Sequence, residues 1–370
     1  MADYLYHAFE RRQRERGIDL DAAKEVIKKF TIETPSWGYG DSGTRFKVFK
    51  KAGVPRNPYE KFDDAAIVHK LTGICPSVAI HIPWDKVDDY TTLKEHAESL
   101  GLQIGAINPN LFQDDDYMLG SITHTDEAIR KKAIQHLLEC VDIARETDSK
   151  VISLWLADGT NYPGQANIRK RKQWMEESLK ETYQAMDDDM QLLIEYKFFE
   201  PAFYHTDLAD WGMAYNTACK LGPKAHVLVD TGHHAQGTNV EHIVAYLLAE
   251  ERLGGFHFNA RKYADDDLIV GSQDPYELFL IFYEILQAMR DKENPGVQKT
   301  AQNIVYMIDQ SHNIEPKIPA MIRSVLNVQT YFAKALLINW DQLEKAQENQ
   351  DVLMAEQAVR EAFEQDVTPL

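Results

Sequence analysis

The 370-residue sequence has few cysteines, no long apolar run and no excess of basic residues. Its three cysteines, Cys75, Cys140 and Cys219, are too few and too scattered for a disulfide framework or a zinc knuckle, which favours a reducing compartment. No stretch approaches the ~18 apolar residues that a membrane span needs, and the first residues lack the apolar core of a signal peptide. These absences predict a cytoplasmic protein without a membrane partner.

The charge balance is strongly acidic. Lys and Arg total 40 against 58 Asp and Glu, which gives a net charge of −18. Such a balance repels phosphate backbones, so we expect no nucleic acid partner. With 44% hydrophobic residues, a chain of this length can bury a large core without a disulfide or a structural metal. The excess of carboxylates remains compatible with a functional metal site.

Eight short apolar runs alternate with longer amphipathic stretches. Most of the runs are rich in β-branched residues, as buried parallel strands are. They occupy residues 31–37, 77–84, 102–110, 150–158, 191–197, 225–232, 254–260 and 303–309. Apolar residues recur at helical spacing in the stretches 128–146 and 240–253 between them. Alternating strands and helices imply a parallel sheet, and eight strands are the number that closes a TIM barrel.

A doubly wound open sheet is the competing fold, but none of the runs leads into a G-x-G-x-x-G turn. We therefore predict an α/β fold, a (β/α)8 TIM barrel with an N-terminal helix and additional C-terminal helices. Residues 1–330 would form the catalytic barrel domain, including a helix over about 1–29. Residues 331–370 would be a C-terminal helical extension for packing or oligomerisation, with the tail read as helices at 319–338 and 340–365. The tail could pack against another subunit or against its own barrel.

Polar side chains stand where the predicted strands end, and a barrel carries its chemistry at that end. They are Glu195 and Lys197 after the fifth run, Asp230 and His233 after the sixth, His257 in the seventh, Asp265 and Asp267 in the following loop, and Asp309 at the end of the eighth. Five carboxylates could not stay ionised together without cations, because their repulsion would raise their pKa values. Mixed oxygen and nitrogen ligands suit Mn²⁺, Mg²⁺, Co²⁺ or Zn²⁺.

Each member of this set also has an ordinary structural interpretation. Asp309 could cap a helix, and the acidic triplets at 114–116 and 187–189 show that a triplet such as 265–267 is often a solvated turn. Glu195 is the hardest to explain structurally, because burying an unpaired carboxylate in an apolar strand costs several kcal/mol. The prediction therefore rests on the whole set.

The order of these residues resembles that of the xylose isomerase-like barrels, which interconvert aldoses and ketoses. Xylose isomerases have Glu where Asp230 stands and Asp where His257 stands, so the chain is more similar to the bacterial L-rhamnose isomerases of broad specificity. The similarity covers roughly residues 1–330. It includes the segments SWGYGDSGTRF (36–46), IHIPWD (80–85), LWLADGTNYPGQ (154–165), EYKFFEPAFYHTD (195–207), VDTGHHAQGTNVE (229–241) and DQSHNIEPK (309–317).

The resemblance implies roles for individual residues. An inner, substrate-organising metal would be held by Glu195, Asp230, His257 and Asp309, and a second, catalytic metal by His233, Asp265 and Asp267, with Asp230 bridging. Lys197 would hydrogen-bond the carbonyl oxygen of the substrate. The pocket would be lined by Trp37, His81, Phe112 and Trp155, and Phe46 would cover the active site of a neighbouring subunit.

The expected activity is the conversion of L-rhamnose to L-rhamnulose, with other pairs such as D-allose and D-allulose also accepted. Two divalent ions per subunit, Mn²⁺ first among them, would serve as cofactors, and a small sugar would be the only partner besides the other subunits of a homotetramer. The residues expected to carry catalysis are Lys197, Asp309, His233 and Asp265. Hydride shift and enediol proton transfer both remain open as mechanisms.

Three rival functions are distinguishable. A one-metal ketose 3-epimerase would have no use for Asp265-x-Asp267 and would need carboxylates on both faces of its substrate. A metal-dependent abasic-site endonuclease would need basic grooves, which the net charge of −18 opposes. A sugar-binding protein would not need metal ligands on the catalytic side.

Overall fold

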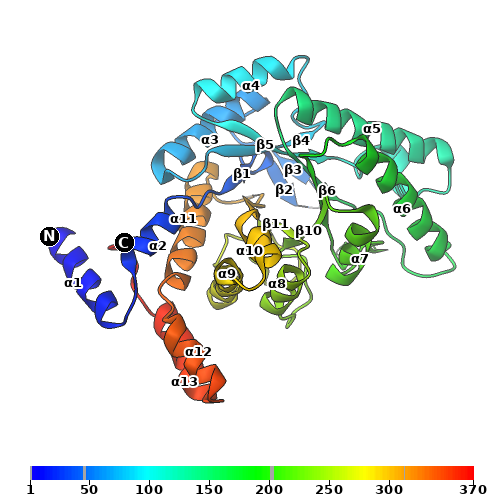
Figure 1. The fold of residues 1–370 in the computed structure, drawn as a ribbon. Coiled ribbons are helices and arrows are strands. Elements are labelled where there is room, and N and C mark those ends of the chain that lie inside the picture. Colours follow the sequence, from blue (N-terminus) through cyan, green and yellow to red (C-terminus); the bar gives the residue numbers. More distant parts are fainter. Residues whose placement is uncertain (1, 45–46, 201–203, 312) are drawn as a thin grey trace.

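A computed structural model describes residues 2–44, 47–200, 204–311 and 313–370. Eight parallel strands close into a barrel in the order β1-β12-β11-β10-β7-β6-β5-β4 (Figure 1). Their bounds are β1 Glu33–Pro35, β4 Ser77–Ile82, β5 Gln103–Pro109, β6 Val151–Trp155, β7 Gln191–Glu195, β10 Ala225–Asp230, β11 Leu253–Phe258 and β12 Val305–Ile308. Each lies within one of the eight apolar runs, except that β11 begins one residue earlier. The predicted TIM barrel is confirmed.

Helices surround the barrel and follow its strands along the chain (Figure 1). They are α3 Pro58–Thr72, α4 Tyr90–Ser99, α5 Glu127–Glu146, α6 Ile168–Ala185, α7 Trp211–Leu221, α8 Val240–Ala249, α9 Pro275–Arg290, α10 Pro295–Gln302 and α11 Lys317–Ala335. In α5, Ala133, Leu137, Cys140 and Ala144 are buried at intervals of three and four residues. This spacing puts them on one face, which packs on the barrel.

Among the described residues, two short hairpins and two 3-10 helices lie at the end of the barrel that is formed by the C-terminal ends of the strands. The hairpin of β2 Ser42–Thr44 and β3 Lys47–Phe49 follows β1, after the 3-10 helix η1 at Ser36–Gly38. A second hairpin, β8 Phe199–Glu200 with β9 Tyr204–His205, follows β7, and the 3-10 helix η2 at Asp115–Leu119 follows β5. These segments form the surroundings of the strand ends.

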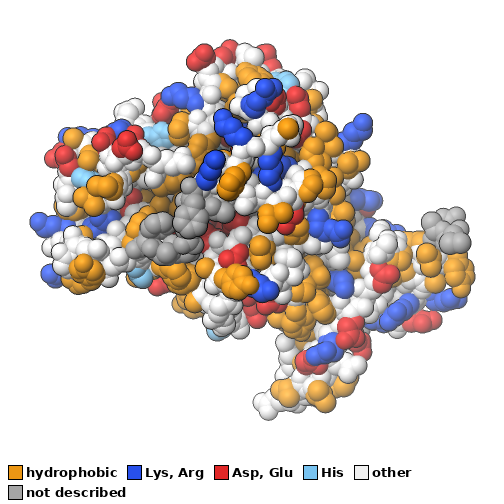
Figure 2. Space-filling view, turned by 180° about the vertical axis from the view of Figure 1, so that it is seen from behind, with side chains coloured by type: hydrophobic (Ala, Val, Ile, Leu, Met, Phe, Trp, Pro, Cys, Tyr) orange, Lys and Arg blue, Asp and Glu red, His pale blue; other side chains and the backbone are white. Residues whose placement is uncertain are grey.

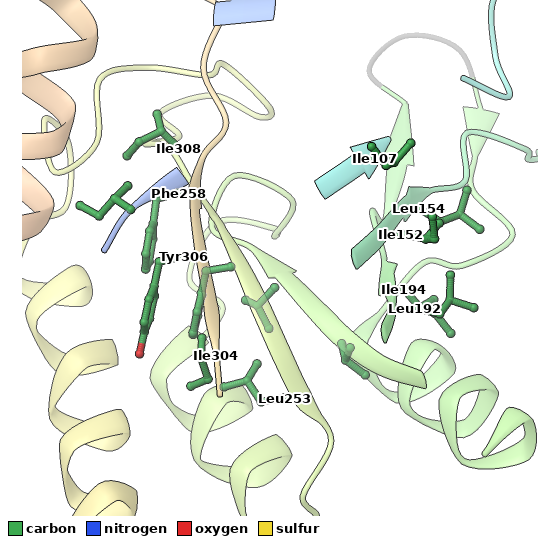
Figure 3. Packing of buried hydrophobic residues seen from close by; sticks show 14 of the residues in the cluster. Ile107, Ile152, Leu154, Leu192, Ile194, Leu253, Phe258, Ile304, Tyr306 and Ile308 are labelled. Atoms are coloured by element: carbon green, nitrogen blue, oxygen red, sulfur yellow. The ribbon is translucent and has the colours of Figure 1, made fainter. Parts of the chain in front are cut away.

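The main core lies between the strands and the helices. The rings of Phe258 and Tyr306, on adjacent strands, are nearly parallel at 4° with centroids 6.2 Å apart (Figure 3). Phe282 of α9 packs on both rings. Smaller side chains, Ala79 and Ala106, form a separate cluster with Met307 from β4, β5 and β12. Because successive residues of a strand face opposite sides, polar residues that alternate with the outer ones enter the barrel.

The terminal helices differ from the expectation. The single helix predicted over about 1–29 is wrong, because the segment forms α1 Ala2–Glu15 and α2 Leu20–Ile27. Between them Gly17 has a φ of +79°, and Asp19 accepts hydrogen bonds from backbone N–H groups at the start of α2. Such a left-handed residue ends a helix and a capping carboxylate begins another.

The helix predicted over 340–365 is also wrong as one piece. It forms α12 Trp340–Glu348 and α13 Val352–Phe363. The break falls at Gln350, whose φ is +57°, and Asp351 caps α13 by accepting a hydrogen bond from the N–H of Met354. The other predicted tail helix, 319–338, corresponds to α11.

The two ends of the chain, α1 together with α12 and α13, form a terminal arm. The helix α1 projects outward (Figure 1), whereas α12 and α13 pack on α9, where the ring centroid of Trp340 lies 5.3 Å from that of Tyr283 and the ring centroid of Phe363 lies 5.4 Å from that of Phe279. Buried Leu337 packs with Phe9 and Ile18, and Gln13 donates a hydrogen bond to Gln365. The tail therefore packs partly on its own chain. Hydrophobic side chains are nevertheless exposed on the arm, among them Val352 and Leu353 (Figure 2). Among the helices of the described residues, none has both the length and the apolar character to cross a bilayer.

Candidate functional site

The ends of four strands bring the first set of predicted residues together. Glu195 is the last residue of β7 and Asp230 the last of β10, where it pairs in register with His257 of β11. Asp309 directly follows β12 and is fixed there by its backbone N–H, which bonds to the carbonyl of Phe258. One potential ligand atom from each of these four residues, the first donor group, lies within 4.8 Å of the others.

His257 is the centre of the first donor group. Its Nδ1 lies 3.2 Å from Glu195 Oε2 and 3.3 Å from Asp309 Oδ2. Its Nε2 faces the hydroxyl of Ser153 at 3.4 Å, and Trp37 Nε1 donates to Asp309 Oδ1 at 2.8 Å. The contacts from Ser153 and Trp37 orient the His257 imidazole and the Asp309 carboxylate. Each of these two side chains keeps one further atom that faces the centre of the donor group.

A second donor group consists of Asp230, His233 and Asp265. His233 Nε2 lies 3.5 Å from Asp265 Oδ1 and 3.9 Å from Asp230 Oδ2. Its Nδ1 lies 3.0 Å from the carbonyl oxygen of Tyr196, whose hydroxyl in turn bonds to His234. Of the adjacent histidines, His233 therefore faces the donor group, while His234 supports the strand end beneath it. Asp230 is common to both groups.

Asp267 is the one predicted ligand that the described structure does not bring within ligand distance of the second group. It lines the same cavity and has a φ of +47°, a conformation that non-glycine residues rarely adopt. The middle residue of the acidic triplet, Asp266, instead accepts hydrogen bonds from backbone N–H groups of its own loop. The triplet thus combines a loop cap with two carboxylates that border the cavity.

Lys197 is the cation beside these groups. Its ammonium lies 2.6 Å from Asp265 Oδ2 and 2.8 Å from Glu200 Oε2, and it sits 5.0 Å from the ring centroid of Trp155. The side chain is only 4% exposed. Although burial alone would lower the pKa of Lys197, Asp265 and Glu200 raise it, so the residue stays charged.

Several pKa values in the two donor groups are shifted because several carboxylates are buried close together. Burial, with Glu195 and Asp309 adding to it, raises the pKa of Asp230 to about 7. Burial would lower the pKa of His233, but Asp230 and Asp265 raise it to about 9. The pKa of Asp267 is likewise raised well above its ordinary value by burial and by Asp265. Protons here partly offset a charge that a divalent cation would balance.

The donor set fits a divalent metal on a further observation. His257 Nδ1 and Asp265 Oδ1 are buried, and neither has a hydrogen-bond partner of suitable geometry among the described residues. Both atoms point into the donor groups, and a cation would satisfy them together with the carboxylates. The cluster can therefore hold metal, with oxygen and nitrogen ligands that suit Mn²⁺, Co²⁺, Mg²⁺ or Zn²⁺.

A cavity of about 700 Å³ opens above the donor groups and has an aromatic wall. The predicted pocket residues Trp37, His81, Phe112 and Trp155 all line it. Burial lowers the pKa of His81 to about 3, so its imidazole is neutral. Phe46, the predicted cover of a neighbouring site, lies outside the described residues.

Several residues at the site were not predicted, among them Trp84 and Asn259. Trp84 lines the cavity and stacks on His81 with ring centroids 3.9 Å apart. It stands in the segment IHIPWD, so the motif contained it without indicating its role. Asn259 donates hydrogen bonds to Asp230, and its position two residues after His257 on the same side of the strand was the available signal.

A closed α/β barrel with carboxylates, imidazoles and a buried lysine at its strand ends has the architecture of the barrel enzymes, which place their active sites at this end. Comparison of the sequence with known families narrows this class. The chain belongs to the xylose isomerase-like TIM barrel family, whose model matches residues 73–296.

Two relatives are similar over nearly the whole chain. A probable sugar isomerase of Rhizobium meliloti is 44% identical over 370 residues, which cover 99% of this chain and 85% of the relative. A probable sugar isomerase of Mesorhizobium japonicum is 41% identical and covered to 84% of its length, again with 99% of this chain. Together with the family match, these findings place the chain among the sugar isomerases and epimerases, enzymes that act on small sugars.

Solved structures agree on the fold at low identity. An L-ribulose 3-epimerase superposes with a TM-score of 0.53 at 12% identity, covering 90% of this chain and 97% of its own. A 3-keto-D-glucoside 4-epimerase from E. coli gives a TM-score of 0.56 at 14% identity, with 82% and 100% covered. A D-allulose 3-epimerase from Methylomonas sp. gives 0.52 at 14%, with 78% and 86% covered. These likenesses concern the fold.

Proposed function

We propose that the protein is a divalent-metal-dependent aldose–ketose isomerase that converts L-rhamnose to L-rhamnulose and accepts other pairs such as D-allose and D-allulose. The observation that carries the proposal is the presence of two donor groups that share Asp230, with the cation of Lys197 beside them. In this reaction the carbonyl group moves between two adjacent carbons of the sugar, so the oxygen on each carbon changes between carbonyl and hydroxyl. A site with two metal ions and a lysine offers positive charge to both oxygens.

The first ion would be held by Glu195, Asp230, His257 and Asp309, and the second by His233, Asp265 and Asp267 with Asp230 shared. When bound, divalent ions would act as Lewis acids on the sugar oxygens. Mn²⁺ is the ion we favour, and Co²⁺, Mg²⁺ and Zn²⁺ fit the same donors.

The residues of the chain supply orientation and charge. Lys197 would donate a hydrogen bond from Nζ to the sugar oxygen that becomes anionic, an effect typically of about 3 kcal/mol. We place Asp309, His233 and Asp265 with Lys197 in the catalytic set, because all four line the cavity. Trp37, Phe112 and Trp155 would pack on the C–H faces of the sugar and exclude water, while neutral His81 would bond a hydroxyl group.

A ketose 3-epimerase that uses one metal is the second candidate. The first donor group is sufficient for a single ion, and the solved epimerases have the same fold. The second donor group and Lys197 favour the isomerase, since a one-metal epimerase does not require them.

One assay separates the two activities. Protein treated with EDTA should lose the conversion of L-rhamnose to L-rhamnulose and regain it with Mn²⁺ or Co²⁺, with products identified by NMR. Activity of the metal-free protein would contradict the proposal. Interconversion of D-fructose and D-allulose without any aldose product would favour the epimerase.

Assembly forms a further part of the proposal. A homotetramer, with residues 331–370 as the extension that joins subunits and Phe46 covering a neighbouring site, would bury the apolar residues that the arm exposes. The division at 330/331 falls inside α11, so the part of the extension that follows the last barrel helix begins with α12. A cytoplasmic location suits the three free cysteines. Solution mass tests the assembly, and a monomer would contradict it.

A further inference from the structure

Asp230, the carboxylate common to both donor groups, is held by an amide. Asn259 Nδ2 lies 2.9 Å from Oδ1 and 3.1 Å from Oδ2 of Asp230, so one NH₂ group reaches both oxygens. The backbone N–H of Gly232 donates to Oδ1 at 2.6 Å. All three residues are buried, and the orientation of the carboxylate is therefore set by these donors.

Asn259 is itself fixed by the neighbouring strand end. Its backbone N–H donates to Thr231 Oγ1 at 3.0 Å, and the Thr231 hydroxyl donates to the Asn259 carbonyl at 2.8 Å. The N–H of Thr231 bonds to the carbonyl of His257 at 3.0 Å. Asn259 and Asp230 are thus joined through the backbone as well as through their side chains, and this limits the freedom of the amide.

Gly232 leaves the space in which the amide lies. A Cβ atom at this position would come within 2.3 Å of Asn259 Oδ1 and 3.1 Å of Asp230 Oδ1. Any larger residue would push the amide from the carboxylate. This close approach is a second observation, independent of the hydrogen bonds, that the site is built around the Asn259–Asp230 contact.

An amide NH₂ has properties that suit a shared carboxylate. It only donates, so it holds the oxygens without competing as a metal ligand, and it carries no charge that would reduce their attraction to a cation. Each carboxylate oxygen has two acceptor sites. Oδ1 accepts from both Asn259 and Gly232, whereas Oδ2 accepts only from Asn259 and keeps an acceptor site. Oδ2 lies 3.9 Å from His233 Nε2 in the second donor group.

We propose that Asn259 is a positioning residue which fixes Asp230 so that this one carboxylate serves both metal ions. The inference rests on the two-metal site of the proposed function. Loss of a hydrogen-bonding partner behind a ligand typically weakens metal affinity by about 10- to 100-fold. Because Asp230 belongs to both groups, the loss of Asn259 weakens both ions, whereas loss of a ligand used by one group weakens chiefly one.

The test is a calorimetric titration of the EDTA-treated full-length protein with Mn²⁺. Asn259→Leu keeps the approximate volume and removes the donor, and Gly232→Ala displaces the amide while retaining it. Both variants are expected to show two binding events, each weakened about 10-fold or more. Asn339→Ala removes a hydrogen-bonding cap of α12 far from the donor groups and is expected to lower the melting temperature without changing either dissociation constant.

The outcomes separate the inference from the proposed function. Two native binding events, with either dissociation constant in Asn259→Leu within twofold of native, overturn the role of Asn259 and leave the two-metal site standing. A single event in the native protein overturns the shared role together with the two-metal assignment. If Asn259→Leu does not fold, Gly232→Ala alone decides, and native affinity for both ions in that variant overturns the inference.

Discussion

Two buried carboxylates of this barrel, Asp158 and Asp230, are stabilised in opposite ways. Asp158, just beyond the end of β6, accepts hydrogen bonds from both the backbone N–H and the hydroxyl of Ser121 and of Thr123, at 2.6–3.0 Å. Asp230 faces an imidazole and further carboxylates, and burial raises its pKa to about 7. The first is satisfied by neutral donors, whereas the second lies among like charges.

The difference shows that burial of a carboxylate does not by itself indicate function. At Asp158 four donors occupy the oxygens, and no ligand position is left. At Asp230 one face is held by donors and the other is directed at groups that cannot satisfy it without a cation. The partners, and not the burial, distinguish a structural carboxylate from a candidate ligand.

The largest effect is expected from a substitution of a proposed metal ligand in the first donor group. Glu195→Gln removes one charge from the first donor group and replaces a carboxylate oxygen with an amide. We expect metal content to fall and kcat/KM to drop by about 10³-fold. Elemental analysis after dialysis and a steady-state assay measure the two. The exposed Glu181 on α6 provides the control, since Glu181→Gln should leave both at native values; native activity in Glu195→Gln would refute the assignment.

Substitution of Asp158, the structural carboxylate, should lower the stability of the protein and leave metal binding unchanged. Asp158→Asn turns an NH₂ group toward two donors, and leaving such buried groups unpaired costs about 1–3 kcal/mol. We expect the free energy of unfolding to fall by that amount in a urea titration, with Mn²⁺ affinity unchanged. Asp126→Asn, which retains a capping oxygen at the start of α5, should change stability by less than about 0.5 kcal/mol. Lost metal affinity in Asp158→Asn would remove the distinction.

A smaller effect is expected at Asp267, which lines the cavity but lies outside the tight second group. Asp267→Asn should weaken the second ion and lower kcat by about 10- to 100-fold, while the first ion and sugar binding largely survive. Calorimetry with Mn²⁺ and the KM for sugar check this. Asp115→Asn, in an exposed triplet of the same type, is the matched control. Equal losses of both ions would show that the two sites are not separable.

Much of the barrel was predictable because strand burial leaves a direct mark on composition. Runs such as residues 225–232 must be apolar on both faces, and a charged residue such as Asp230 marks the strand end. The helix breaks at Gly17 and Gln350 were not predictable from periodicity. Gly17 is tolerated inside many helices, and Gln350 has no intrinsic preference for a positive φ.

The sequence predicted which residue types form the site, but it predicted their contacts only in part. Asp230 and His233 were expected as ligands, but the support of Asp230 by Asn259 depends on the register between β10 and β11, which a sequence does not state. His234 could not be separated from His233 by pattern. Only the fold shows that one imidazole faces the donor groups and the other bonds to Tyr196.

A third case is the carboxylate of Glu284, a half-buried residue on α9. It has no hydrogen bond or ion pair among the described residues, and burial, with a contribution from Glu241, raises its pKa to about 7. An unfolded glutamate titrates near 4.5. The folded state therefore binds this proton more tightly, so the group favours folding fully below about pH 4.5 and loses that contribution as the pH rises through 7.

Glu284→Gln should accordingly stabilise the protein at alkaline pH only. The amide stays neutral at every pH, so the variant avoids the burial of a charge at pH 8, and we expect a gain of about 1 kcal/mol after allowing for partial exposure. At pH 4.5 the two proteins should unfold at nearly the same urea concentration, because Glu284 is then neutral as well. The exposed Glu348→Gln should show no gain at either pH. A gain of equal size at both pH values would mean that packing, and not the proton, explains the effect, and Glu284 would then no longer be a third kind of carboxylate beside Asp158 and Asp230.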